Sequence, residues 1–439
     1  MQWSRYNLLF ESKNNGWLLY NSGSNSFLQM DYDAVKFIRA IAQNPNMDFT
    51  HRPSLFLKLR LGGFLVEDGK DDDLFRILKM RRLTTAYAGN HLMLTIALTK
   101  ACTFDCIYCF ERDRTPSQIT DKTEENIIRF IKKHKAISSI GITWYGGEPL
   151  LEFERMKSLS RKIEELGKDY KASIYTNGYL LTPEIIGSLN ELKVGGMLIS
   201  IDGSKETHDK RRFLIGGGST YDKIIENIDN LMRSDWKGHL NLRVNVDKSN
   251  GLEFVNVYRF IEKKYPELFN KRIVVFPSFV TDVHLDLDVN CYNDSDSIGE
   301  FLLDLVREHD IDALGIFPSI ALKGCTLIKR NAYVVGPNGE LYKCTIDLGD
   351  YGDGELVGNI DDMTNWNMSF VAEGMVGASY LNDTQCEKCF FFPICDGGCP
   401  KIRFYNNRDN GNRDTCTHLK KHIKEFLEFH YERKIKAIK

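Results

Sequence analysis

Three cysteines lie within eight residues of the chain, in the stretch Cys102-Thr103-Phe104-Asp105-Cys106-Ile107-Tyr108-Cys109. It directly follows the apolar run 92–98, which predicts a buried strand. Three thiolates this close are typical of an iron-sulfur cluster, and a cubane held by only three of them leaves one iron free for another ligand. A zinc site is the alternative, but structural zinc takes four ligands and no histidine lies near in the sequence.

Strand and helix patterns alternate around this loop, between residues 92 and 280. Apolar residues at helical spacing, such as Ile127, Phe130 and Ile131, fill the intervals between strands. Five further strands are predicted at 140–144, 172–175, 197–201, 240–246 and 273–276. Six consecutive strand–helix units predict an α/β fold with parallel strands in a partial (β/α)6, TIM-like barrel. Its active site would lie at the C-terminal ends of the strands.

Two other regions flank this barrel, which is predicted to span 90–285. Residues 1–85 form a small α+β module, with strands at 8–11, 17–20 and 27–30 and a helix at 33–42. Its last part, an acidic run at 71–73 and an amphipathic stretch at 74–83, is interpreted as a linker. Residues 286–439 hold most of the cysteines among Asn, Gly and Asp turns and end in an amphipathic helix at 419–438. This predicts a separate, metal-organised domain.

Charge and composition exclude several classes of partner. With 439 residues and a formal net charge of -2, the chain has no basic field that would gather nucleic acid. It shows neither a signal peptide at its start nor an 18-residue apolar stretch, so we expect a cytoplasmic protein without membrane contact. Its 11 cysteines are then expected to be metal ligands or reactive thiols rather than disulfides.

Polar or glycine-rich motifs follow the next predicted strands, where a ligand would contact the barrel. The residues concerned are Tyr145-Gly146-Gly147-Glu148-Pro149 after the second strand, Asn177 after the third, Ser200 and Asp202 at the fourth, and Arg212 shortly beyond. Arg243 and Asn245 alternate with apolar residues on the fifth strand and should point into the barrel. Each motif alone is equally typical of a turn or a solvated loop, so their order along the chain carries the argument.

The cysteine loop and the motifs after it resemble the radical SAM superfamily. The resemblance implies that Cys102, Cys106 and Cys109 hold a catalytic 4Fe-4S cluster whose open iron binds S-adenosylmethionine (SAM). The Glu148 carboxylate and the backbone beside it would hold the SAM amino group, Ser200 the ribose or carboxylate, and Arg212 the carboxylate. The full set of SAM-contacting residues implied is Tyr108, Gly146, Gly147, Glu148, Pro149, Asn177, Ser200, Asp202, Arg212 and Arg243.

A second set of cysteines lies in the last quarter of the chain. Its spacing reads Cys325-x13-Gly339-x4-Cys344 and then Cys386-x2-Cys389-x5-Cys395-x3-Cys399-x16-Cys416. Taken by itself, a Cys-x2-Cys pair followed by further cysteines fits a zinc ribbon as well as an iron-sulfur site.

Because it follows the first loop, this spacing resembles the SPASM extension of radical SAM enzymes. That resemblance implies two auxiliary 4Fe-4S clusters, three clusters in all. One would be held by Cys386, Cys389, Cys395 and Cys416, and the other by Cys325, Cys344 and Cys399. Some members have an eighth cysteine where this chain has Asn331, so the second cluster keeps an open iron or takes a ligand from elsewhere. Cys291 is left over and needs no role.

The resemblance predicts a peptide maturase. An electron from a flavodoxin or ferredoxin would lead to cleavage of SAM and to hydrogen abstraction from a ribosomally made precursor peptide. The N-terminal module would bind the leader of that peptide at a sheet edge. The product would carry a thioether or carbon–carbon crosslink.

Two other functions remain open. An anaerobic sulfatase-type maturase, which forms formylglycine, resembles the chain over barrel and SPASM region. Such enzymes carry an Asp directly after the cysteine matched by Cys344, where this chain has Thr345, with Asp347 two residues on. The alternative from another class is an iron-sulfur electron carrier or redox sensor.

Overall fold

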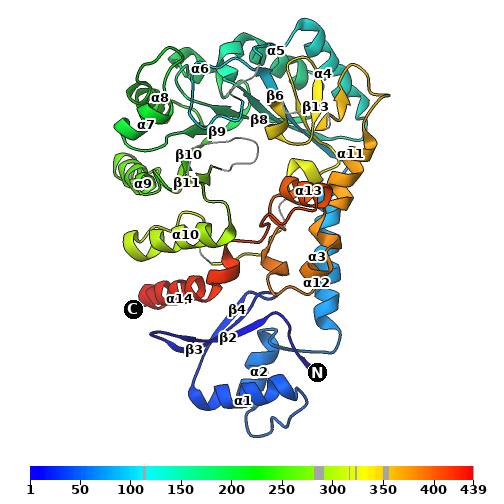
Figure 1. Ribbon diagram of the computed structural model, residues 1–439, viewed down its shortest axis with the longest axis vertical. Helices are drawn as coiled ribbons and strands as arrows, with labels where there is room; N and C mark the ends of the chain where they lie inside the picture. Colours follow the sequence, from blue (N-terminus) through cyan, green and yellow to red (C-terminus); the bar gives the residue numbers. More distant parts are fainter. Residues whose placement is uncertain (112–114, 281–290, 316, 322–323, 350–354, 439) are drawn as a thin grey trace. The chain divides into compact units, whose positions relative to one another are not determined.

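The structure is a computed structural model that describes residues 1–111, 115–280, 291–315, 317–321, 324–349 and 355–438 (Figure 1). These residues divide into two compact units. The barrel unit comprises 88–293 and 329–375, and the second unit comprises 1–87, 294–328 and 376–439. The predicted domain boundary between 285 and 286 falls outside the described residues, and the three predicted domains remain a prediction.

Six parallel strands form the centre of the barrel unit. They are β6 (His91–Thr99), β7 (Ser139–Gly146), β8 (Asp169–Thr176), β9 (Val194–Ser200), β10 (His239–Val246) and β11 (Ile273–Phe279). Each pairs in parallel with the next along the chain, so the order in the sheet is the order in the sequence. This confirms the predicted α/β fold, and all six strands deliver their C-terminal ends to one edge.

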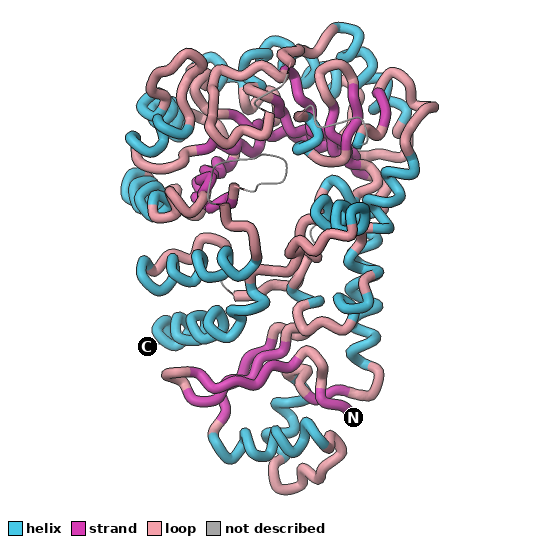
Figure 2. The backbone as a smooth tube through the Cα atoms, viewed as in Figure 1, coloured by secondary structure: helices cyan, strands magenta, loops and turns pink. Residues whose placement is uncertain are grey.

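One face of this sheet is apolar and covered by helices. On one face the side chains of alternate residues are apolar and buried, as in Leu92, Leu94 and Ile96 of β6. The helices that connect the strands follow the outer side of the sheet (Figures 1 and 2). They are α4 (Asp121–Lys133), α5 (Phe153–Glu164), α6 (Pro183–Ser188), α7 (Lys205–Arg211), α8 (Tyr221–Arg233) and α9 (Glu253–Lys264). Thr120 and Thr182 begin two of them by accepting a backbone N–H bond.

Three strands extend the sheet in a way that the sequence did not predict. They are β12 (Ala332–Val335), β13 (Glu340–Tyr342) and β14 (Gly358–Asn359). β12 pairs in parallel with β6, and β13 and β14 continue antiparallel. Strand β12 therefore occupies the side of β6 that β11 would need to close a barrel, and the sheet stays open. Helix α11 (Met368–Ala372) follows.

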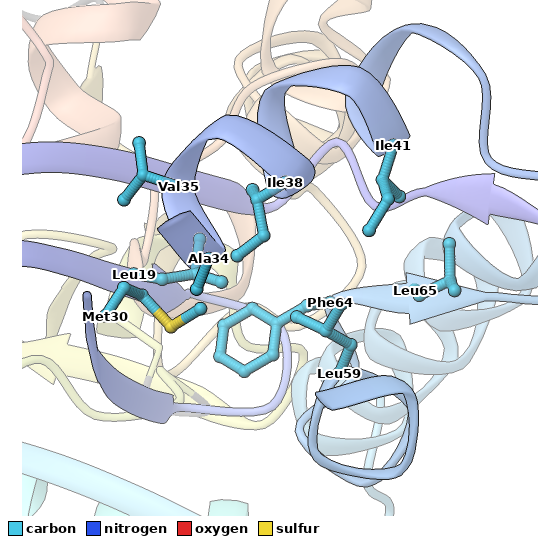
Figure 3. Packing of buried hydrophobic residues seen from close by; sticks show 9 residues of the cluster. All are labelled: Leu19, Met30, Ala34, Val35, Ile38, Ile41, Leu59, Phe64 and Leu65. Carbon is cyan, nitrogen blue, oxygen red and sulfur yellow. The ribbon is translucent and has the colours of Figure 1, made fainter. Parts of the chain in front are cut away.

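The N-terminal part of the second unit is a small sheet with helices, as predicted. Strands β2 (Asn7–Ser12), β3 (Gly16–Asn21) and β4 (Ser26–Met30) pair antiparallel, and the short strands β1 (Gln2–Trp3) and β5 (Leu65–Val66) pair with each other. Helices α1 (Tyr32–Gln43) and α2 (Pro53–Leu61) complete the module. Their buried apolar side chains share one core: Leu19, Met30, Ala34, Val35, Ile38, Ile41, Leu59, Phe64 and Leu65 (Figure 3).

The rest of the second unit is helical. It contains α3 (Lys70–Ala86), α10 (Ser295–His309), α12 (Thr384–Glu387), α13 (Pro400–Asp409) and α14 (Leu419–Ile438). The stretch interpreted as a linker is therefore a continuous helix, α3, whose Phe75 and Leu78 pack in a core with Tyr380 and Phe392. Among the helices described, none is both long and apolar enough to cross a membrane.

Candidate active site

A cavity of about 280 Å³ opens at the C-terminal edge of the six parallel strands. This volume lies near the lower end of the roughly 300–1,000 Å³ that small-molecule sites enclose. The loop after β6 contributes all three of its cysteines to the lining. Other lining residues that the sequence singled out are Tyr108, Gly146, Gly147, Asn177, Ser200, Arg212, Arg243 and Asn245. Predicted residues from five different strands or strand ends thus meet at one cavity.

The cysteine loop is held in place by backbone hydrogen bonds to the last residue of α7 and to the segment directly after it. Asp105 N donates to Phe213 O at 2.9 Å and Ile107 N to Arg211 O at 3.1 Å. Burial raises the pKa of the Cys106 thiol to about 12; the nearby Arg212 guanidinium opposes this shift, and the neighbouring thiols of Cys109 and Cys102 add to it. Metal ligation requires the thiolate, so the Arg212 guanidinium is the neighbour that favours the form of Cys106 that binds iron.

Glycines let the turn after β7 touch the start of the cysteine loop. A Cβ on Gly147 would lie 2.2 Å from the carbonyl oxygen of Ala101, and one on Gly146, at φ +125°, would lie 2.2 Å from that of Thr99. Gly147 N instead donates to Thr99 O at 2.9 Å. The two glycines are thus required by backbone contact with the loop that carries Cys102.

The Glu148 carboxylate is fully buried and joins the ends of two strands, β7 and β8. Its oxygens accept from Thr176 Oγ1 at 2.7 Å, from Asn177 N at 2.7 Å and from Leu150 N at 3.0 Å. Burial is the largest cause of its raised pKa, which these three donors oppose. Glu148 does not line the cavity, and Pro149 after it begins a short 3₁₀ helix. The predicted contact of Glu148 with the SAM amino group remains a prediction.

A buried polar network lies beneath the cysteine loop, around the hydroxyl of Tyr108. The hydroxyl donates to Asp202 and accepts from Arg212 Nη1 at 2.8 Å and from Asn245 Nδ2 at 3.0 Å. Burial is also the first cause of the raised pKa of Tyr108. Asp202 is 0% exposed and does not line the cavity, so its observed contacts are with this network.

A second arginine, Arg211, adjoins the network and pairs with two carboxylates. Arg211 Nη1 lies 2.7 Å from Asp247 Oδ2, and Arg211 Nε lies 3.6 Å from Asp202 Oδ2. Both carboxylates are fully buried, and the single Arg211 guanidinium lies between them, which lowers the cost of burying their charge in a medium of low dielectric. Neither Arg211 nor Asp247 was singled out from the sequence, because an ion pair between distant residues has no local pattern.

Three predicted residues present polar atoms along the cavity wall. Arg243 lies directly opposite Ser200 in the pairing of β10 with β9, and its Nε donates to Ser200 Oγ at 3.1 Å. Asn177 Nδ2 donates to Thr103 Oγ1 at 3.0 Å, inside the cysteine loop. The first bond fixes Arg243 against Ser200, and the second fixes Asn177 against the cysteine loop.

Several cavity residues were not among the predicted cluster ligands or SAM contacts. They are mostly aromatic or apolar: Phe104, Phe110, Glu111, Tyr145, Tyr175, Leu198, Ser278, Phe279, Val280 and Ile346. Tyr145 and Tyr175 meet edge to face with ring centroids 6.0 Å apart. Both end strands on the face opposite the apolar core, so the alternation of buried residues along β7 and β8 was the signal that would have identified them.

The cavity fits a three-thiolate cluster and a zwitterionic ligand. Within the described residues, no three His, Cys, Asp or Glu side chains are placed to hold a single metal ion. A cubane does not need that convergence, because each thiolate binds a different iron. Arg212 Nε is buried and has no hydrogen-bond partner among the described residues, which leaves a cationic donor beside the cavity for a carboxylate.

The four cysteines predicted for one auxiliary cluster all lie in the second unit. Cys389 N donates to Cys386 O at 3.1 Å, and Gly397 N donates to Cys395 Sγ at 3.3 Å. A Cβ on Gly398 would lie 2.2 Å from the carbonyl oxygen of Thr415, so the loop after Cys395 touches the segment before Cys416.

The cysteines predicted for the other auxiliary cluster are divided between the units. Cys344 belongs to the barrel unit, and Cys325 and Cys399 belong to the second unit, where both are exposed. Their grouping remains a prediction. Cys291 is buried and belongs to the barrel unit.

Comparison with known proteins adds a family and several relatives. Residues 96–261 match the model of the Radical SAM superfamily. The cysteine-type anaerobic sulfatase-maturating enzyme of Clostridium perfringens (strain 13) is 25% identical over 373 residues, which cover 77% of this chain and 95% of that enzyme. The serine-type enzyme of Bacteroides thetaiotaomicron is 26% identical over 356 residues, 70% of this chain and 82% of that enzyme.

Solved structures share the fold. Native anSMEcpe with bound AdoMet has a TM-score of 0.60 and 22% identity, over 79% of this chain and 98% of that one. Streptococcus suis SuiB bound to precursor peptide SuiA has a TM-score of 0.52 and 16% identity, over 95% of this chain and 98% of that one. The likeness to SuiB therefore extends over almost the whole chain.

Proposed function

We propose that this chain, an enzyme whose residues 96–261 form a domain of the Radical SAM superfamily, modifies a ribosomally made precursor peptide and installs a thioether or carbon–carbon crosslink. The observation that carries the proposal is the cavity at the strand ends. It joins the cysteine loop to a cationic side chain, Arg212, and to an aromatic wall formed by Tyr145 and Tyr175.

Within this cavity Cys102, Cys106 and Cys109 would hold a 4Fe-4S cluster. Cluster and SAM together would supply one-electron cleavage of a sulfonium bond and a radical that abstracts hydrogen. The side chains do the positioning. The buried Arg212 Nε would hold the carboxylate of SAM, while Ser200, Arg243 and Asn177 line the wall with polar atoms.

Crosslinking removes two hydrogen atoms from the peptide, and the balance requires an electron acceptor. One hydrogen leaves as an atom in the first abstraction. The second leaves as a proton when the new bond forms, and one electron is left over. We assign its acceptance to the two auxiliary clusters, and delivery of the initiating electron to a flavodoxin or ferredoxin.

The N-terminal module is proposed to bind the leader of the peptide. Its three-stranded sheet has the order β2-β3-β4, so β2 and β4 are edge strands to which a peptide strand can pair. The likeness to SuiB, a structure solved with its precursor peptide, supports a peptide substrate.

Formylglycine formation is the second candidate. The curated relatives named anaerobic sulfatase-maturating enzymes favour it, since they cover up to 77% of this chain. Thr345 stands where such enzymes carry an aspartate, which favours the crosslink.

The test is coexpression of the chain with a short peptide encoded beside its gene, followed by mass spectrometry of the peptide. We expect a loss of two hydrogens and no reaction with an aminooxy probe for aldehydes. Conversion of serine to formylglycine also removes two hydrogens, so the aldehyde probe is the discriminating measurement. The matched control is the Cys102→Ala/Cys106→Ala/Cys109→Ala variant, which should leave the peptide unchanged. A labelled aldehyde would overturn the crosslink in favour of formylglycine.

A further inference from the structure

Helix α3 brings a buried arginine to the four cysteines of the second unit. Arg82 is only 5% exposed. Its Nε donates to Ala321 O at 3.1 Å, and its Nη2 donates to Phe392 O at 2.8 Å and to Cys395 O at 3.0 Å. The guanidinium carbon lies 4.4 Å from the centre of the Phe392 ring. Arg82 therefore fixes the loop that carries Cys395.

Within the part of the chain that the structure describes, no carboxylate forms an ion pair with the guanidinium of Arg82. Its Nη1 atom is buried without a hydrogen-bond partner there. A buried cation without a counter-charge is costly, so an anion held next to Arg82 would be stabilised by it.

Two further cations point at sulfur atoms of the same four cysteines. Arg403 Nη2 lies 3.5 Å from Cys386 Sγ, and Lys420 Nζ lies 3.1 Å from Cys416 Sγ. Arg403 also pairs with Asp383 at 3.2 Å. The cation triad, defined as Arg82, Arg403 and Lys420, thus reaches this set of cysteines from α3, α13 and α14, three separate helices.

We infer that the cation triad compensates the charge of a 4Fe-4S cluster on Cys386, Cys389, Cys395 and Cys416 and raises its reduction potential, with Arg82 as the main positioning residue. This rests on the proposal that these four thiolates hold a cluster. Such a cluster is a dianion when oxidised and a trianion when reduced. Fixed positive charge in a medium of low dielectric stabilises the reduced form more strongly. The triad therefore favours acceptance of the electron released during crosslinking.

The experiment is a redox titration of the whole chain, prepared anaerobically and followed by electron paramagnetic resonance without peptide. A low-potential chemical reductant supplies the one electron that the cluster gains. The signal that disappears in the Cys389→Ala variant is assigned to this cluster. In Arg82→Gln we expect that signal to titrate at a more negative potential, by at least tenfold in the equilibrium constant, which is about 59 mV for one electron. Arg82→Lys keeps the positive charge, so its potential should stay close to that of the unmodified chain.

Lys420 provides a second, exposed site for the same test. Lys420→Gln should shift the potential in the same direction by less, because solvent screens an exposed charge. Lys424→Gln on the same helix is the matched control and should leave the potential unchanged. If Arg82→Gln prevents cluster assembly, the shift in Lys420→Gln decides.

Two results would overturn the inference. One is an intact signal whose potential, in both Arg82→Gln and Lys420→Gln, equals that of the unmodified chain. The other is the absence of any Cys389-dependent signal in the unmodified chain. Either result leaves the proposed crosslinking open, since that is measured separately on the peptide.

Discussion

Replacing Tyr108 by phenylalanine should loosen the cysteine loop, because it deletes one buried oxygen and nothing else. That oxygen donates to the Asp202 carboxylate and accepts from the Arg212 guanidinium at 2.8 Å and from Asn245 at 3.0 Å. A hydrogen bond to a charged group contributes about 1.5–3 kcal/mol. The substitution removes two such bonds, but the attraction between Asp202 and Arg212 remains and offsets part of the loss. Counting one bond, the free energy of opening the loop falls by that amount, which is roughly a 10- to 150-fold increase in the opening equilibrium.

Amide hydrogen exchange over residues 102–109 measures this opening directly. Asp105 and Ile107 donate backbone N–H bonds to the segment 211–213, so their protection reports whether the loop is closed. We expect protection to fall 10- to 150-fold in Tyr108→Phe. Tyr175→Phe is the matched control, because Tyr175 lines the same cavity and its hydroxyl has no hydrogen-bond partner among the described residues. Equal protection in both variants would refute the role assigned to the Tyr108 network.

Gly147→Ala should lower iron loading by one cluster and decrease thermal stability, because its Cβ would lie 2.2 Å from a backbone oxygen of the cysteine loop. Gly195→Ala meets no atom within 4 Å and should change neither, so equal loading would count against the contact. Burial lowers the pKa of His208 to about 4, and the Arg212 guanidinium adds to the shift. The contribution of the neutral imidazole to the free energy of unfolding is therefore complete above pH ~6.5 and is lost as the pH falls toward 4. Denaturant unfolding should show about 1 kcal/mol less stability from this group at pH 5.5 than at pH 7. The difference should disappear in His208→Gln, and its persistence would assign the pH dependence to another group.

The strands and the cluster loop could be predicted because their signals are local. Leu92, Leu94 and Ile96 alternate along one strand, and three cysteines within eight residues follow it. Parallel pairing of successive strands then places all the loops that follow them at one edge. The presence of Ser200, Asn177 and Arg243 near one another follows from that topology alone.

What the sequence did not predict depends on contacts between distant residues. Strand β12 has four buried residues and no alternation, and only its pairing with β6 identifies it as part of the sheet. Helix α3 was interpreted as a linker because of its acidic start, although Arg82 reaches the loop of Cys395, more than 300 positions away. The predicted contact of Asp202 with SAM stays a prediction, and its side-chain contacts with Tyr108 and Asn245 have no local sequence pattern. A polar motif locates a site in the sequence, but its partners are set by packing.

The central claim is that three thiolates at the strand ends hold a cluster with an open iron that binds SAM. The direct measurement is the yield of 5'-deoxyadenosine from SAM under strong reductant, without peptide, for anaerobically reconstituted protein. We expect product from the unmodified chain and none from the variant in which Cys102, Cys106 and Cys109 are alanine. Product from that variant, or none from a fully loaded unmodified chain, would contradict the account.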